Sequence, residues 1–224
     1  MNSLEVLYED NHLLVVNKPA ALPTMGTPGE RLTLLTLAKE YVKEKYRKPG
    51  NVYLGIMSRL DAPVTGVVLL ARTSKAAARL TAQFRGHAVQ KLYWAAVEGR
   101  IEPAAGRCVD WIGQDERHRR MHIVGPAFPG AKEARLSYRR FGQFADGSLL
   151  EVELQTGRKH QIRLQLAHRG YPVLGDRKYG SRRPFAAGIA LHARRLVIAH
   201  PVGGEPLVFE APAPAAWRRF GVLP

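Results

Sequence analysis

The sequence has little cysteine, few acidic residues and no long apolar run, and each shortage excludes a class of protein. Cys108 is the only cysteine among 224 residues, so neither an internal disulfide nor a zinc site built on cysteine pairs is possible. No uninterrupted apolar stretch approaches the roughly 20 residues that a membrane span needs. Glu5, Glu9 and Asp10 stand where a secretory signal would be basic and then apolar. The sequence therefore predicts a cytoplasmic protein without a membrane segment.

Positive charge, by contrast, is abundant. The chain has 34 Lys and Arg against 19 Asp and Glu, a formal net charge of +15. Such an excess attracts polyanions, because neutralising phosphates releases condensed counterions. Nucleic acid is the expected partner; the alternatives are a merely basic protein or one that touches an anionic membrane surface. No glycine-rich nucleotide motif occurs, and the histidines show no metal-ligand spacing, so the sequence supports neither a nucleotide cofactor nor a metal site.

Strand patterns outnumber helix patterns, and most are joined by short turns. Helices are predicted from Thr27–Glu30 to about residue 48, after Thr73 and Ser74, and over Ile162–His168. The predicted strands are 4–8, 13–16, 67–71, 92–97, 136–141, 150–154, 191–199 and 207–209. These patterns predict one domain over 1–224 of the α+β class, with a mixed, largely antiparallel sheet flanked by helices and loops. The polar segment Gln114–Lys132 is predicted to be a mobile insertion.

The first candidate site is Ser58-Arg59-Leu60-Asp61, shortly before the apolar strand at 67–71. An acid beside an arginine, between a turn and a core strand, can be held ionised and fixed in direction. A carboxylate positioned in this way can act as a nucleophile or a base. The alternative is a structural Arg59–Asp61 pair that closes the loop.

The second candidate is Lys91-Leu92-Tyr93, at the start of the strand predicted over 92–97. A strand-borne tyrosine beside a lysine can stack on a nucleobase and exchange a proton with it. The alternative is a tyrosine that fills the hydrophobic core.

The third candidate is Thr156–Arg163, where a strand gives way to a helix. Helix N-termini suit phosphates, because their backbone N–H groups and their dipole both favour negative charge. The polar and cationic side chains gathered here are Arg158, Lys159, His160 and Gln161. Arg163 lies among apolar residues and so needs an anionic partner, which we expect to be Asp61. The alternative is a solvated basic face of the helix.

Taken in order along the chain, these motifs resemble the RluA family of pseudouridine synthases. The resemblance covers nearly the whole chain, as a catalytic domain without the S4 RNA-binding module that many relatives carry. It departs from the family pattern at Ser58, where His is usual, and at Val64-Thr65-Gly66, where Thr-Ser-Gly is commoner. The matching segments are Val6–Pro19 with its final Asn-Lys-Pro, Arg59-Leu60-Asp61 with Thr65-Gly66, Lys91-Leu92-Tyr93, Gly157–Arg163, Val173–Asp176 with Tyr179-Gly180, and Leu191–Ala193.

The resemblance implies an isomerase that converts specific uridines of structured RNA, ribosomal or transfer, to pseudouridine by flipping the base into a central RNA-binding cleft. It implies that Asp61 is the nucleophile, that Tyr93 stacks on the flipped base and that Arg163 keeps Asp61 ionised. Arg59 is expected to help displace the base. The residues expected to contact RNA are Arg59, Lys91, Arg158, Lys159, His160 and Gln161.

The resemblance implies no metal, no organic cofactor and no protein partner, and we expect a monomer. One alternative is a non-catalytic RNA-binding or RNA-folding protein on the same fold, which has no need to keep Asp61, Tyr93 and Arg163 together. Another is a carboxylate-based hydrolase of a small anionic substrate, which explains neither the positive charge nor the ordered motifs.

Overall fold

The computed structural model describes residues 4–26, 32–115, 120–186 and 188–221. The chain forms two compact units: unit 1 is Met1–Val89 with Ala193–Pro214, and unit 2 is Gln90–His192 with Ala215–Pro224. In the described residues the strands outnumber the helices. The pairs β1–β2 and β2–β4 of unit 1 are antiparallel, as are the pairs β5–β9, β9–β8, β8–β6 and β6–β7 of unit 2. The predicted α+β class is thereby confirmed, and a single domain over 1–224 stays a prediction.

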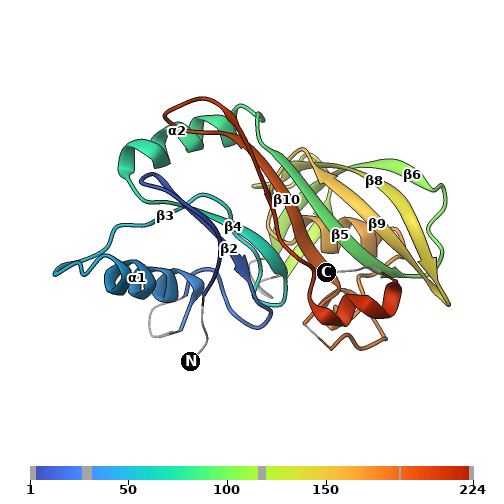
Figure 1. The fold of residues 1–224 in the computed structure, drawn as a ribbon. Coiled ribbons are helices and arrows are strands. Elements are labelled where there is room, and N and C mark those ends of the chain that lie inside the picture. The colour runs from blue at the N-terminus through green and yellow to red at the C-terminus, as the bar shows by residue number, and fades with distance from the viewer. Residues whose placement is uncertain (1–3, 27–31, 116–119, 187, 222–224) are drawn as a thin grey trace. The chain divides into compact units, whose positions relative to one another are not determined.

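Unit 1 contains the strand order β1-β2-β4-β10, with β3 paired to β4 and β11 paired to β10 (Figure 1). β4 is buried along its whole length, as its unbroken apolar sequence predicts. Leu69 of β4 and Leu80 of α2 share one hydrophobic cluster, so α2 packs on the sheet. The elements are β1 (Glu5–Glu9), β2 (Leu13–Lys18), α1 (Leu34–Lys45), β3 (Gly55–Ile56), β4 (Thr65–Ala71), α2 (Ser74–Arg85), β10 (Leu191–Ala199) and β11 (Pro206–Glu210).

The two helices of unit 1 begin at threonine caps. Thr73 accepts a hydrogen bond from the backbone N–H of Ala76, which confirms the predicted cap of α2. Thr27–Glu30, the predicted start of the first helix, lies outside the described residues. The described part of α1 begins at Leu34, after a capping box formed by Thr33 and Thr36.

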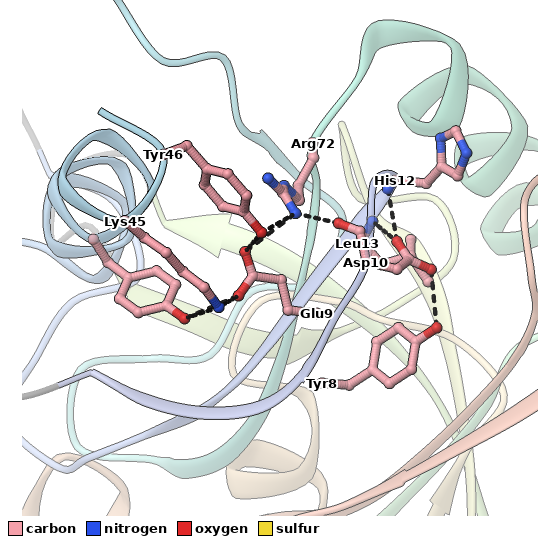
Figure 2. A network of polar contacts seen from close by, with 9 residues as sticks. Tyr8, Glu9, Asp10, His12, Leu13, Lys45, Tyr46 and Arg72 are labelled. Atoms are coloured by element: carbon pink, nitrogen blue, oxygen red, sulfur yellow. Dashed lines mark hydrogen bonds and ion pairs between the residues drawn. The ribbon is translucent and has the colours of Figure 1, made fainter. Parts of the chain in front are cut away.

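A polar network joins α1 to the β1–β2 hairpin (Figure 2). The Glu9 carboxylate, at the end of β1, accepts hydrogen bonds from Lys45 at 2.6 Å and Tyr46 at 2.8 Å, and lies 3.1 Å from the Arg72 guanidinium. Burial alone would raise the pKa of Glu9, but the hydrogen bonds from Lys45, Tyr46 and Tyr41 outweigh it and lower the pKa. Glu9 thus fastens the helix to the hairpin as an ionised group.

Gly66, in the predicted catalytic motif, is required by close backbone packing. Its φ is +114°, a conformation that side-chain-bearing residues rarely adopt. A Cβ at this position would also lie 2.3 Å from the carbonyl oxygen of Ala193 on β10. Glycine therefore lets β10 approach β4 at the start of that strand, a few residues after Asp61.

Unit 2 contains the strand order β5-β9-β8-β6-β7, with β5, β9, β8 and β6 side by side in Figure 1. By register Tyr93 lies opposite Val152, which lies opposite Tyr138, so the three share one sheet face. The elements are β5 (Gln90–Glu98), β6 (Ala105–Asp115), β7 (Arg120–Val124), β8 (Lys132–Phe144), β9 (Gly147–Leu154), α3 (Gln161–His168) and the 3-10 turns η1 (Arg177–Tyr179) and η2 (Ala215–Phe220).

Each face of this sheet is covered by a different element. Leu164 of α3 packs with Ile112 and Ala134, and strand alternation places Ala134 on the same face as Tyr138. On the other face the Trp94 ring lies 6.3 Å from the Trp217 ring of η2, measured between centroids. Tyr93 therefore stands on the face that carries α3.

The prediction that Gln114–Lys132 is a mobile insertion is wrong, because described residues of this segment form strands. This segment holds the end of β6, the whole of β7 and the start of β8, with residues 116–119 outside the described part. Asp115 pairs in register with Arg120, so β6 and β7 form a hairpin. β6 itself was not predicted, because Asp110 interrupts its apolar pattern. Arg169 neutralises that carboxylate at 2.9 Å, and the Gln165 amide donates a hydrogen bond to it at 2.6 Å.

Candidate active site

Asp61 lies in the loop between β3 and β4, in unit 1. The Thr24 hydroxyl makes two hydrogen bonds to the backbone of Leu60, the residue before Asp61. Leu60 N–H donates to Thr24 Oγ1 at 3.1 Å, and Thr24 Oγ1 donates to Leu60 O at 2.8 Å. Behind it, Val64 N–H donates to the carbonyl of Asp61 at 3.0 Å. The half-buried Asp61 side chain thus projects from a fixed backbone, as a nucleophile requires.

Ser58, where the family usually has His, has a structural contact of its own. Its hydroxyl accepts a hydrogen bond from the Leu69 N–H at 2.9 Å, which ties the start of the loop to β4. Arg59, the next residue, is exposed. The departure at Ser58 therefore leaves the loop anchored and Arg59 available to solvent.

Lys18, of the Asn-Lys-Pro motif, is completely buried beside this loop. Its ammonium donates to the carbonyl oxygens of Pro19 at 2.7 Å, Leu22 at 2.7 Å and Ala62 at 3.0 Å. Burial lowers the pKa of Lys18 to about 8, and the charge of Asp61 opposes part of that fall. A buried lysine thus holds the loop through three backbone carbonyl groups.

Replacing Lys18 with Met should destabilise the protein by about 2–5 kcal/mol, because buried carbonyls lose a charged donor. The pKa of Lys18 is about 8 in the folded chain, against an ordinary 10.5. Between these values the unfolded chain binds more protons, so the stability of the wild type rises with pH there. The gap between wild type and K18M should therefore widen from pH 8 towards pH 10 in urea unfolding.

Exposed Lys75 on α2 supplies the control. Lys75→Met should change the unfolding free energy by less than about 0.5 kcal/mol at every pH. A K18M gap that stays constant from pH 7 to pH 10 would contradict the buried ammonium.

Lys91 and Tyr93 lie on β5 in unit 2, both half-buried. Burial is the main cause that lowers the pKa of Lys91, and the nearby charge of Arg158 lowers it further. The effect indicates that Lys91 of the second motif and Arg158 of the third are near enough for their charges to interact. Two of the predicted RNA contacts are therefore neighbours.

The segment before α3 is shaped by Gln161, which is 3% exposed. Its Oε1 accepts from Thr156 Oγ1 at 2.8 Å and from Arg158 N–H at 3.0 Å, and its Nε2 donates to Arg135 O at 3.1 Å. The amide is thus engaged by the protein itself. The structure gives Gln161 a positioning role in this segment, where the sequence suggested a direct contact with RNA.

Arg158, Lys159 and His160 lead into α3. Arg158 and Lys159 are exposed, and Arg158 Nε donates to Glu133 O at 2.9 Å. His160 has a left-handed backbone with φ 57°, and its Nδ1 lies 2.7 Å from the hydroxyl of Tyr179. No side chain caps α3 in the part of the chain that the structure describes. The segment presents cations at a helix N-terminus, as predicted for a phosphate contact.

Arg163 is buried in α3 and forms a two-point ion pair with Asp176. The distances are 2.7 Å from Nε to Oδ2 and 2.9 Å from Nη2 to Oδ1, and the guanidinium carbon lies 5.1 Å from the centre of the Tyr179 ring. The prediction that Arg163 needs an anionic partner is confirmed, with Asp176 in that role. The pairing of Arg163 with Asp61, which belongs to the other unit, stays a prediction.

Sequence reasoning missed Thr24, and it gave no role to Lys18, Asp176 and Tyr179, although the segments that resemble the family contain all three. A further local signal for Lys18 was its place at the end of the apolar strand Leu13–Lys18. Within the described residues no cluster of His, Cys, Asp and Glu could hold a metal ion. Nor does any described helix have the length and apolar character to cross a membrane.

Known proteins share both the sequence and the fold. The family model described as RNA pseudouridylate synthase matches residues 12–168. The ribosomal large subunit pseudouridine synthase D of Pseudomonas aeruginosa is 36% identical over 94% of this chain and 68% of its own length. The tRNA pseudouridine synthase C of Pectobacterium carotovorum is 32% identical over 96% of this chain and 60% of its own length. The chain thus spans about two thirds of the length of these relatives.

Among solved structures, the human RNA pseudouridylate synthase domain containing 4 superposes with a TM-score of 0.79. It is 25% identical, with 97% of this chain and 93% of that chain covered. The sequence relatives, this structural match and the ordered motifs agree. The chain belongs to the RNA pseudouridylate synthase family, as an isomerase of the RluA type.

Proposed function

We propose that this enzyme isomerises uridine in structured RNA with Asp61 as the nucleophile. The observation that carries the proposal is the Asp61 loop, which Thr24 and Lys18 fix on either side of the carboxylate. The Asp61 carboxylate attacks the flipped uridine and the bond from the ribose to N1 breaks. The uracil then rotates and rejoins the ribose through C5, and the bond to Asp61 breaks so that the carboxylate is released; C5 loses its proton while N1 gains one. Nothing is added or removed overall, so no cofactor is required.

Tyr93 and Arg163 of unit 2 and Arg59 of unit 1 supply the other roles. Tyr93 stacks on the flipped base and can accept the proton, and it lies on the same face of β5 as Lys91. Arg163, held in one orientation by Asp176, stabilises the negative charge of Asp61. Arg59 helps to displace the base from the RNA.

RNA is held mainly through its phosphates. The contacts that we propose come from Arg59, Lys91, Arg158, Lys159 and His160, with Gln161 positioning the segment. Phosphate contacts of this kind can offset the few kcal/mol needed to extrude a base. The two sequence relatives act on large-subunit ribosomal RNA and on transfer RNA, according to their names. We propose one of these two classes as the substrate of a monomeric, cytoplasmic enzyme.

The proposal is tested by tritium release from RNA labelled at C5 of uridine. Ribosomal and transfer RNA transcripts are incubated separately with the purified protein. C5 loses its hydrogen only when the new carbon–carbon bond forms, so release reports the reaction and not binding. Release from one pool establishes the activity and its RNA class. Tight binding without release from either pool would favour the non-catalytic RNA-binding alternative.

A further inference from the structure

The turn η1 lies against the α3 loop, here defined as residues 156–160. Tyr179 of η1 contacts His160 through its hydroxyl at 2.7 Å. The ring of Tyr179 also packs against the apolar cluster of Ile112, Ala134 and Leu164 that anchors α3. Any ligand that reaches the α3 loop therefore has η1 beside it.

Cationic side chains continue from η1 onto the β6–β7 hairpin. Arg177 and Lys178 of η1 are both exposed, as is Arg120, the first residue of β7. Arg120 reaches η1 directly, because its Nη2 donates to the carbonyl oxygen of Lys178 at 3.1 Å. These three residues, Arg120, Arg177 and Lys178, are called the β7–η1 strip.

Two of the acidic residues near the strip are paired with cations outside it. Asp176 is neutralised by Arg163, and the Glu133 carboxylate lies 3.5 Å from Arg135. Asp115 faces Arg120 across the hairpin. The strip and the α3 loop together present exposed cationic side chains on unit 2, namely Arg120, Arg158, Lys159, Arg177 and Lys178.

We propose that the β7–η1 strip binds the phosphate backbone of the RNA that flanks the target uridine. This inference rests on the proposed function and extends its RNA interface beyond the motif residues. Arginine and lysine on an exposed turn and hairpin contact phosphates without reading the bases. The strip therefore contributes affinity and register, while the chemistry stays with the residues around Asp61.

The test compares two triple variants of the full chain. R120Q/R177Q/K178Q removes the strip. The matched control, R100Q/R107Q/R139Q, removes the same charge elsewhere on unit 2. Arg107 and Arg139 alternate with Cys108 and Tyr138 on their strands, so they lie on the sheet face opposite α3. All six residues are exposed, so both variants should fold, which thermal unfolding checks.

Affinity for the RNA transcript that shows tritium release is measured between about 50 and 200 mM salt. For the strip variant, the slope of log affinity against log salt should become less steep by about one for each phosphate that the variant no longer neutralises. At about 150 mM salt its affinity should fall roughly 10-fold or more. Its single-turnover rate at saturating enzyme should match that of the wild type. The control should keep the wild-type slope.

An unchanged slope in the strip variant, or an equal change of slope in the control, overturns the proposal that the strip binds RNA. A lower single-turnover rate at saturation also overturns it, since the residues would then act on the chemistry. Failure of the proposed function looks different: the wild type binds RNA with the expected salt slope but releases no tritium. In that case the salt slopes of the strip variant and the control are compared on the transcript that the wild type binds more tightly, and the same outcomes decide whether the strip binds RNA.

Discussion

Asp61→Asn should abolish tritium release, with a loss on the order of 10⁴-fold or more, while the affinity for RNA stays within about threefold of the wild type. An amide has the shape of the carboxylate but lacks the negative charge and nucleophilicity that the reaction needs. The loop itself should survive, because Thr24 and Lys18 hold the backbone of Leu60 and Ala62 on either side of Asp61. Single-turnover tritium release and a binding titration separate the two effects.

Asp146→Asn is the matched control for this substitution. Asp146 is an exposed acid that pairs with Arg183 at 2.6 Å in unit 2, far along the chain from the catalytic motif. The control should release tritium at the wild-type rate. Turnover by Asp61→Asn within tenfold of the wild type would remove Asp61 from the role of nucleophile.

Asp176→Asn should lower the stability of the protein by about 3–5 kcal/mol, because the buried guanidinium of Arg163 loses its opposite charge. The two side chains are only 7% and 1% exposed, so water cannot replace the carboxylate. For a chain of this size the melting temperature should fall by about 10 °C. Differential scanning calorimetry measures the shift, and tritium release below the new melting temperature shows how strongly Arg163 depends on Asp176 for its orientation.

The exposed pair of Asp146 and Arg183 again provides the comparison. Its side chains are 67% and 44% exposed, and the loss of such a surface pair should cost less than about 1 kcal/mol. Equal melting temperatures for Asp176→Asn and Asp146→Asn would show that the Arg163–Asp176 pair adds no more than a surface contact.

Local patterns predicted the elements that depend on neighbouring residues. The apolar run of β4, the alternating residues of β9 and the Thr73 cap were all found where periodicity and capping chemistry indicated. β6 was missed, since Asp110 breaks its apolar pattern and is neutralised only by Arg169, 59 residues later. The β6–β7 hairpin was missed because its polar strands look like a loop when their pairing is unknown.

The candidate catalytic residues were likewise within reach of the sequence, because each motif is a short run of consecutive residues. Arg59-Leu60-Asp61, Lys91-Leu92-Tyr93 and the segment before α3 could therefore be recognised together with their order. What supports them could not be recognised. Lys18 bonds to a carbonyl 44 residues away, and Arg163 finds its anion 13 residues later, across a turn. Burial and long-range pairing decide such partners, and only the folded chain brings those atoms together.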